Sequence, residues 1–398
     1  MNDRTPQGED DAKLRDLALL FTKLGCVAFG GPAAHIAMMR AEIVGRLRWM
    51  GEQEFLDLMG ASNLIPGPNS TELAIHIGRV RAGRRGLLVA GTCFILPAFL
   101  IVLAAAILYV RFGSTPQAEG LLFGITPVVV AIVAHALWGF LRQAVKGPFL
   151  AAVGIGALVL YFVGVGELLL LFGGALLVLA VRFVRTRRGE HEALILPLDL
   201  PLGLLAAPAT LAGTLGIFVS FLKIGSVLFG SGYVLLAFLR SEFVDPGLLT
   251  YQQLLDAVAV GQVTPGPVFT TATFIGYVLA GVPGAVLATV GIFLPGFVFV
   301  ALTGPIIPRL RDSSVLAGLL DGANVASLAL MAGVTWQLGR ASLVEPVPAL
   351  IALAALVMLF ATEVNPAWLV LGGGSLGFAY HSLLGGTSKQ TPYTQSDE

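Results

Sequence analysis

The chain has 398 residues, of which 56% are hydrophobic and 12% are charged, and its formal net charge is zero. A soluble domain carries about 25% charged residues, so this composition excludes a soluble globular protein and indicates an all-α polytopic membrane protein. The basic residues lie in short loops, so no nucleic-acid partner is expected.

Five regions are predicted along the chain. They are a polar N-terminal tail without a cleaved signal peptide (1–16), a first transporter repeat (17–185), a linker with an apolar connector (186–216), a second transporter repeat (217–384) and a polar C-terminal tail (385–398). Within the linker, it stays open whether the apolar stretch 194–215 crosses the membrane.

The first repeat opens with an apolar segment over residues 17–39, which is interrupted by Phe29-Gly30-Gly31-Pro32. The elements expected after it are a basic loop, a helix over 52–64, the corner Pro66-Gly67-Pro68, a half-helix over 69–77 and a second basic loop over 79–85. Three or four further membrane segments are predicted in the windows 86–110, 120–141 and 149–183. Windows of this kind are long enough to span ~30 Å of hydrocarbon.

The second repeat matches the first at a nearly constant offset. Lys23 corresponds to Lys223, Leu96-Pro97 corresponds to Leu294-Pro295, and the Pro-Gly-Pro corner recurs as Pro265-Gly266-Pro267. So many matches indicate an internal duplication. With both repeats counted, about ten to twelve membrane segments are expected.

The loop charges differ between the two repeats. The basic loop 79–85 corresponds to the uncharged segment 277–283, whereas Arg309 and Arg311 appear where the first repeat has only Arg111. Lys and Arg favour the cytoplasmic side of a membrane. The repeats are therefore predicted to be inserted in opposite orientations.

Each Pro-Gly-Pro corner predicts a broken or re-entrant helix inside the membrane. Proline lacks an N–H and pushes the preceding residue out of the α region, so the helix cannot continue. Small hydroxyl and amide residues follow each corner and would begin a new helix. A helix N-terminus offers free N–H donors and the positive end of a dipole, which attract anions. Two such ends, related by a repeat, predict a transporter's binding site.

Three longer motifs suggest a family. FGGPAAH at 29–35, LIPGPNSTELAIHIG at 64–78 and GQVTPGPVFTTATFIGY at 261–277 resemble the chromate ion transporter family in its long, two-domain form. The resemblance covers roughly residues 17–311. It implies a multi-pass protein of the bacterial inner membrane that exports chromate, confers chromate resistance and recognises sulfate as an analogue. One departure is that Gly230-Ser231-Gly232 stands where the first repeat has Gly30-Gly31-Pro32, so the halves are not equivalent.

Chromate and sulfate are tetrahedral dianions, so their site needs several donors and compensating positive charge. The N–H groups of residues 69–71 and 269–271, with the neighbouring side chains, are the expected donors. The alternative is that the corners only bend the chain, that the hydroxyls bond their own backbone and that the lysines reach the membrane interface. The substrate-binding candidates are Lys23, Gly30, Gly31, Pro66, Gly67, Pro68, Asn69, Ser70, Thr71, Lys223, Pro265, Gly266, Pro267, Thr270 and Thr271.

A second group of residues is considered for coupling and gating: Glu72, His35, His76, Arg40, Arg240, Asp57 and Asp256. Glu72 has no acidic counterpart, because Thr271 takes its place, and it is either a proton carrier or a carboxylate stabilised by the helix dipole. The two arginines are expected mainly in ion pairs at the membrane surface and the two aspartates mainly as braces of the broken helices. The histidines are expected mainly as packing or hydrogen-bonding residues.

These observations predict a secondary transporter that exports chromate. No P-loop motif is present, so an ion gradient, the membrane potential or a partner must supply the energy. An uptake carrier or channel for sulfate or another oxyanion, a membrane-embedded lipid-phosphate enzyme and a scaffold are the alternatives. No cofactor and no metal are expected, since Cys26 and Cys93 have no metal-ligand spacing. The expected partners are the chromate or sulfate oxyanion, membrane lipid and, in a homodimer, a second copy of the chain.

Overall fold

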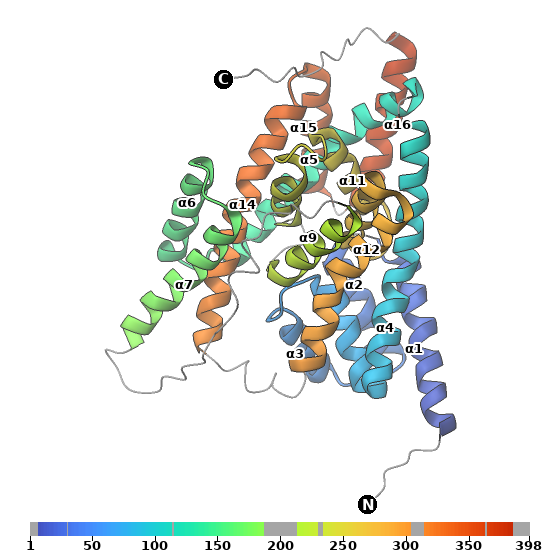
Figure 1. Ribbon diagram of the computed structural model, residues 1–398, viewed down its shortest axis with the longest axis vertical. Coiled ribbons are helices and arrows are strands. Elements are labelled where there is room, and N and C mark those ends of the chain that lie inside the picture. Colours follow the sequence, from blue (N-terminus) through green and yellow to red (C-terminus); the bar gives the residue numbers. More distant parts are fainter. Residues whose placement is uncertain are drawn as a thin grey trace, which may run out of the picture.

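The computed structural model describes residues 7–29, 31–113, 115–186, 213–229, 234–303, 314–362 and 364–384. Within these ranges every regular element is a helix, which confirms the predicted all-α class. Figure 1 shows the long helices bundled along one axis, with shorter helices between them.

The described helices of the two halves follow the same order, except that the short η4 of the second half has no separate counterpart in the first. The first half contains α1 (Gln7–Val27), α2 (Gly31–Arg40), the π-helical η1 (Ala41–Arg46), α3 (Glu52–Ser62), α4 (Asn69–Phe112), α5 (Pro116–Ala144), α6 (Pro148–Phe162) and α7 (Glu167–Thr186). The second half contains α9 (Thr214–Val227), α10 (Leu235–Leu239), the π-helical η3 (Arg240–Val244), α11 (Tyr251–Val263), the short 3₁₀-helical η4 (Val268–Thr270), α12 (Thr271–Thr303), α14 (Ser314–Ser342), α15 (Pro346–Ala361) and α16 (Pro366–Leu384). The predicted duplication is therefore present in the order of the elements.

The first helix begins earlier than predicted. Residues 7–16, assigned to the polar tail, form the first turns of α1. Their glutamate, aspartate, alanine, lysine and leucine residues are compatible with a helix, so the break at Leu17 in hydropathy is not a break in structure. The remainder of that tail, most of the 186–216 linker, the C-terminal tail and Gly30 lie outside the described residues.

The predicted basic loop after the first half-helix is wrong. Instead, α4 reverses direction at Ala82-Gly83, and α12 does so at the equivalent Ala280-Gly281. Gly83 has φ 59° and ψ −144°, a conformation open essentially to glycine alone. A Cβ on Gly78 would overlap the carbonyl of Gly86, whereas residues eight apart in a straight helix are ~12 Å apart. The arginines of this segment thus lie on a tight helical hairpin.

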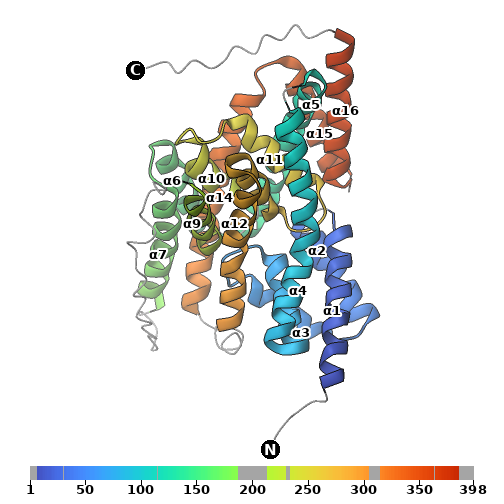
Figure 2. The ribbon, with the colours of Figure 1, turned by 45° about the vertical axis from the view of Figure 1, so that its right-hand side comes forward.

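The second arms of these two hairpins run antiparallel to each other. Leu87 packs in one cluster with Val300, and Gly91 lies directly against the ring of Phe297. In Figure 2, α4 runs upward to its C-terminal end while α12 runs downward. Equivalent helices that meet antiparallel are related by an axis perpendicular to them, which lies in the membrane plane. The two repeats are therefore inverted, as predicted.

The repeats also exchange their C-terminal hairpins. The pair α6 and α7, from the first half, packs against α14 of the second, and the pair α15 and α16 packs against α5 of the first. By contrast, α4 stays with α1 and α12 stays with α9. Each repeat therefore completes the packing of the other.

Five helices of the described chain are long and apolar enough to cross a membrane: Asn69–Phe112, Pro116–Ala144, Glu167–Val184, Val268–Thr303 and Val315–Ser342. Three shorter apolar helices accompany them: Pro148–Phe162, Thr214–Val227 and Pro346–Ala361. The total of ten to twelve segments stays a prediction.

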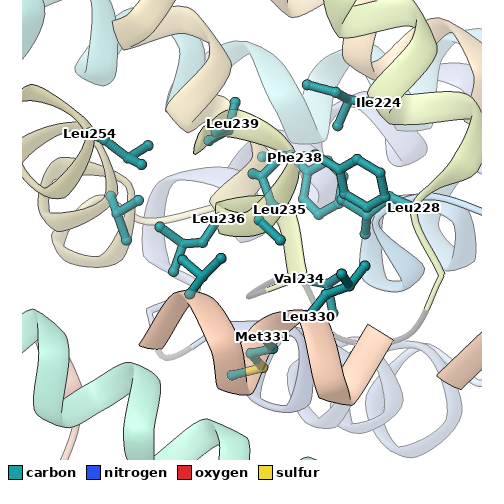
Figure 3. Packing of buried hydrophobic residues seen from close by; sticks show 14 of the residues in the cluster. Ile224, Leu228, Val234, Leu235, Leu236, Phe238, Leu239, Leu254, Leu330 and Met331 are labelled. Atoms are coloured by element: carbon teal, nitrogen blue, oxygen red, sulfur yellow. The ribbon is translucent and has the colours of Figure 1, made fainter. Parts of the chain in front are cut away.

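The largest apolar core of the described chain draws on both halves and includes the short helix α10. Every residue of α10 is buried, and the cluster brings Leu236 and Phe238 together with Leu330 and Met331 of α14 (Figure 3). This packing places the segment before the second corner firmly against a membrane-spanning helix.

Candidate functional site

Both Pro-Gly-Pro corners break a helix, as predicted. In the first repeat α3 ends at Ser62 and α4 begins at Asn69, and in the second α11 ends at Val263 and η4 begins at Val268. The two corner glycines have positive φ angles, 135° at Gly67 and 90° at Gly266, which favour glycine.

Each corner is hydrogen-bonded to the opposite repeat. The Gly67 N–H donates to the carbonyl of Leu228 at 2.8 Å, and the Gly266 N–H donates to the carbonyl of Ala28 at 2.9 Å. The two bonds are equivalent under the internal repeat, since Ala28 corresponds to Leu228. The first corner is thus bonded to the segment before Gly230, and the second corner is bonded to the segment before Gly30.

The two corners meet at one pocket of about 490 Å³. Its polar side chains are all neutral, and among the described residues no charged side chain lines it. The lining residues are Pro32, Ala33, Asn63, Gly67, Pro68, Asn69, Ser70, Ala136, Gly139, Phe140, Gln143, Ala144, Pro267, Val268, Phe269 and Asn324.

The free backbone donors differ slightly from those predicted. In the first corner the N–H of Thr71 donates to the Pro68 carbonyl at 2.7 Å, which leaves the N–H groups of Asn69 and Ser70 without a backbone partner in the described chain. In the second corner the N–H groups of Thr270 and Thr271 are used inside the turn, which leaves those of residues 268 and 269. All four residues with a free N–H group, Asn69, Ser70, Val268 and Phe269, are among those that line the pocket.

The side chains after the first corner face a small polar network. Ser70 Oγ lies 3.2 Å from His35 Nδ1, and His35 Nε2 lies 3.0 Å from the Ala28 carbonyl. The Asn69 amide donates to Asn63 Oδ1 at 2.7 Å. His35 is therefore a hydrogen-bonding residue, which is one of the two roles expected for the histidines.

The threonines of the corners are turned away from the pocket. Thr270 and Thr271 are fully buried, and their hydroxyls donate at 2.8 Å to the carbonyls of Pro267 and Val268. Thr71 is also buried, and its hydroxyl has no partner in the described chain. At the second corner, the threonine hydroxyls therefore bond their own backbone, which is the alternative that the sequence analysis left open.

Neither predicted lysine lines the pocket. Lys23 donates to Glu42 at 2.7 Å, and Lys223 donates in the same way to Glu242. The pairs are equivalent under the repeat. Lys23, with Arg46 beside it, holds the pKa of the Glu42 carboxyl below its usual range.

Both arginines form ion pairs, as predicted, and their position at the membrane surface stays a prediction. Arg40 pairs with Glu52 at 2.7 Å, and Arg240 pairs with Asp245 at 3.2 Å. Arg240 also donates to the hydroxyl of Tyr251 at 2.9 Å. The nearer glutamates, Glu42 and Glu242, are occupied by the lysines.

The acidic candidates fall into two kinds. Asp256 accepts hydrogen bonds from Tyr109 of α4 at 2.8 Å and from Gln252 at 2.9 Å, so it braces the broken helix against the opposite repeat. Asp57 accepts a bond from Gln53 at 3.0 Å. Glu72, in contrast, is fully buried and both of its carboxylate oxygens lack a hydrogen-bond partner in the described chain.

His76 and Gly31 complete the predicted set. His76 is buried one turn after Glu72, with Nε2 unpartnered among the described residues. Gly31 opens α2 with φ 77° and is itself buried. In the described part of the chain, no three His, Cys, Asp or Glu side chains are grouped as metal ligands.

Three amide residues of the pocket escaped the sequence analysis, and Asn63, directly after α3, is the first of them. Gln143 lies near the end of α5 and Asn324 lies in α14, and both bring a side-chain amide to the pocket. The signal that could have found Asn324 is an uncharged amide inside a membrane-length apolar helix, where polar side chains are costly.

Comparison with known proteins agrees with the two-repeat architecture. A family model described as "Chromate transporter" matches residues 15–179 and again residues 215–378. A probable chromate transport protein of Synechococcus elongatus is 32% identical over 350 residues, which cover 86% of this chain and 89% of that protein. A chromate transport protein of Cupriavidus metallidurans is 30% identical over 384 residues, covering 93% and 94%, and one of Pseudomonas aeruginosa is 31% identical over 382 residues, covering 90% of each. No solved structure matches the chain.

Proposed function

Because the chain belongs to the chromate transporter family, we propose that it is a secondary transporter that carries chromate outward across the bacterial inner membrane and so confers chromate resistance. The observation that carries the proposal is the single pocket at which the two Pro-Gly-Pro corners meet. Each corner brings unpaired backbone N–H groups to it from an inverted repeat.

The pocket suits a dianion that is held without an ion pair. Each helix N-terminus carries about half a positive charge, and behind the second corner η4 leads directly into the first arm of α12. Two such ends offset about half of the charge of chromate. The amides of Asn69, Gln143 and Asn324 add neutral donors, which hydrogen-bond the oxygens without fixing the anion as tightly as a buried lysine or arginine would.

The membrane potential supports outward movement. A negative interior favours the exit of a dianion by about 4–5 kcal/mol per 100 mV. In this mechanism the two inverted corners are the moving parts. The hydrogen bonds from Gly67 to Leu228 and from Gly266 to Ala28 couple the movement of each corner to the opposite repeat. Chromate is released when one corner moves away from the pocket and opens it to the opposite side.

The test is flux of labelled chromate in proteoliposomes that contain the full chain. Starting from equal chromate concentrations on both sides, we expect net movement of chromate toward the positive side when a potassium gradient with valinomycin sets the potential, and no net movement when the potential is zero. Protein-free vesicles are the control. Chromate flux no faster than in protein-free vesicles would exclude the proposal.

The same vesicles separate the proposed substrate and direction from the alternatives. Sulfate has the same charge and shape, so we expect it to compete with chromate. A protein that moves sulfate and excludes chromate, or that concentrates chromate on the negative side, is instead an uptake carrier. Cells that gain chromate tolerance with the full chain support export.

A further inference from the structure

One buried group is not used by the transport mechanism above. Glu72 is fully buried, and neither carboxylate oxygen has a hydrogen-bond donor in the described part of the chain. Its equivalent in the second repeat is Thr271, whose hydroxyl is used within its own turn. The carboxyl therefore belongs to one corner only.

Glu72 lies against the inner side of the first corner. A Cβ on Gly67 would overlap Glu72 Oε1, and a Cβ on Gly296 of α12 would lie 3.6 Å from the same oxygen. At the second corner the equivalent of Gly296 is Ala98, whose methyl group lies 2.8 Å from the Cβ position of Gly266. A methyl group is thus enough to support that corner, and the carboxyl of Glu72 is not required by packing.

The surroundings supply no charge that could pair with this carboxyl. On its own helix, His76 and then Arg79 follow at one-turn intervals, and Arg79 donates to the carbonyls of Val300 and Ala301. From α2, His35 is bonded to Ser70 and to a backbone carbonyl. From α12 there is no Asp, Glu, Lys, Arg or His at all.

α9 approaches the corner at Gly225, and its Lys223 is paired with Glu242. Three further helices pack against α4: Lys23 of α1 is paired with Glu42, Asp57 of α3 accepts a hydrogen bond from Gln53, and Asp256 of α11 accepts one from Tyr109. An unpaired carboxylate in such a site is far less stable than the neutral acid. The carboxyl is thus protonated while the corner is closed around it.

Protonation and anion binding share this corner. Gly67, which touches the carboxyl on one side, lines the oxyanion pocket on the other, and Asn69 and Ser70 lie within one turn of Glu72. A negative charge on Glu72 would repel a dianion in the pocket across a region of low dielectric, whereas the neutral acid would not. The two ligands, proton and dianion, therefore favour each other's binding.

We propose that Glu72 is a proton-binding site linked to the oxyanion pocket, so that binding of the dianion requires the protonated carboxyl. The reaction is a simple balance: the carboxylate takes one proton from water as the anion binds, and returns it to water when the corner opens. This proposal rests on the proposed function, because it needs an oxyanion in the pocket.

The experiment is binding of radiolabelled chromate to the purified full chain by equilibrium dialysis, in the alkaline range in which chromate stays a dianion. We expect the Kd of the wild type to rise with pH, by up to about tenfold per pH unit for one linked proton. The glutamine of Glu72→Gln resembles the neutral acid. This variant should therefore bind chromate, at every pH tested, with the Kd that the wild type shows at the lowest pH. Glu119→Gln, at an exposed carboxyl on α5, is the matched control and should follow the wild type.

A second measurement does not depend on the variant. In weakly buffered solution with a pH indicator, the wild type should take up close to one proton per chromate bound at the alkaline end. A pH-independent Kd together with no proton uptake would overturn the linkage, even if Glu72→Gln fails to fold. The infrared band of a protonated carboxyl, present in the wild type and in Glu119→Gln but missing from Glu72→Gln, supports the site independently.

These outcomes are separable from failure of the proposed function. A wild-type protein that neither binds nor moves chromate refutes the transport proposal. In that case the infrared band still decides whether Glu72 carries a proton.

Discussion

At the scale of single residues, the pocket is lined by amides and one serine and by no charged side chain in the described chain. Each neutral donor contributes modestly, about 0.5–1.5 kcal/mol per hydrogen bond. Selectivity for a tetrahedral oxyanion then depends on several weak donors held in a fixed arrangement, so that loss of any one should be measurable and none should abolish transport.

Asn324→Leu removes one such donor from α14. We expect the Kd for chromate to rise about tenfold, the equivalent of one lost hydrogen bond, with little change in thermal stability. Thr335→Val on the same helix is the control, because the Thr335 hydroxyl donates to the Met331 carbonyl and does not line the pocket. Equal effects of the two variants on the Kd would contradict a role of Asn324 in binding.

Ser70→Ala and Thr270→Val test which corner hydroxyl is used. Ser70 lines the pocket, whereas the Thr270 hydroxyl is bonded to Pro267. Ser70→Ala should therefore weaken chromate binding about tenfold, while Thr270→Val leaves the Kd near the wild-type value. Chromate dialysis checks both, and a larger effect at Thr270 would mean that the second corner rearranges to bind the anion.

The lysine pairs should matter for stability rather than for affinity. The Lys223 and Glu242 side chains are only 18% and 11% exposed, so Lys223→Met leaves a half-buried carboxylate that keeps a hydrogen bond from the Ser220 hydroxyl, and it should cost about 1–3 kcal/mol. The double variant with Glu242→Leu should regain most of this free energy. Denaturant unfolding in detergent measures the free energy of unfolding of the single and double variants. The Lys23 side chain is 55% exposed, so Lys23→Met should cost about 1 kcal/mol or less.

Chromate dialysis on folded Lys23→Met then tests the earlier expectation that the lysines bind substrate. A large loss of affinity without loss of stability would support that expectation against the ion-pair interpretation.

At the scale of elements, the tight helical hairpins decide where the corners lie. The arms of α4 touch where Gly78 faces the backbone of Gly86, and the arms of α12 touch at the equivalent Gly276 and Gly284. This contact leaves no room for a side chain, so the half-helix that begins at the corner is fixed to the long arm behind it.

Gly78→Ala should separate the arms of the first hairpin, because the added methyl group meets backbone that cannot move aside. We expect a loss of about 1–3 kcal/mol, the cost typical of overpacking. Gly60→Ala on α3, where a Cβ meets open space, should be neutral or slightly stabilising. Thermal unfolding compares the two, and equal melting temperatures would argue against a rigid hairpin.

At the scale of the whole molecule, inversion of the repeats places the two hairpin reversals on opposite sides of the membrane. Arg84→Cys and Val282→Cys occupy equivalent exposed positions beside the reversals. After replacement of Cys26 and Cys93, a membrane-impermeant thiol reagent should label position 84 only from the cytoplasm, because the arginines lie there. It should label position 282 only from outside; labelling of both from one side would refute inversion.

Much of this architecture could be predicted from local sequence. Apolar windows of membrane length, the prolines of the corners and the match between Lys23 and Lys223 are all properties of short segments or of their repetition. The all-α class, the duplication, the broken helices and the inverted orientation were therefore predicted before the fold was known. Hydropathy alone failed at residues 7–16, where a helix forms from charged residues, and at the 79–85 segment, where two helical arms meet at a tight reversal instead of a loop.

The details of the site depended on contacts between residues far apart in the chain. Neighbouring sequence could not show that Gly67 bonds to Leu228, that Lys23 pairs with Glu42, or that Asn324 joins the pocket. Periodicity and breaker residues act over a few positions, and they dictate which segments are helices and where they stop. Which donors remain free, and which carboxyl is buried without a partner, follows from how two inverted halves pack together and exchange their last hairpins.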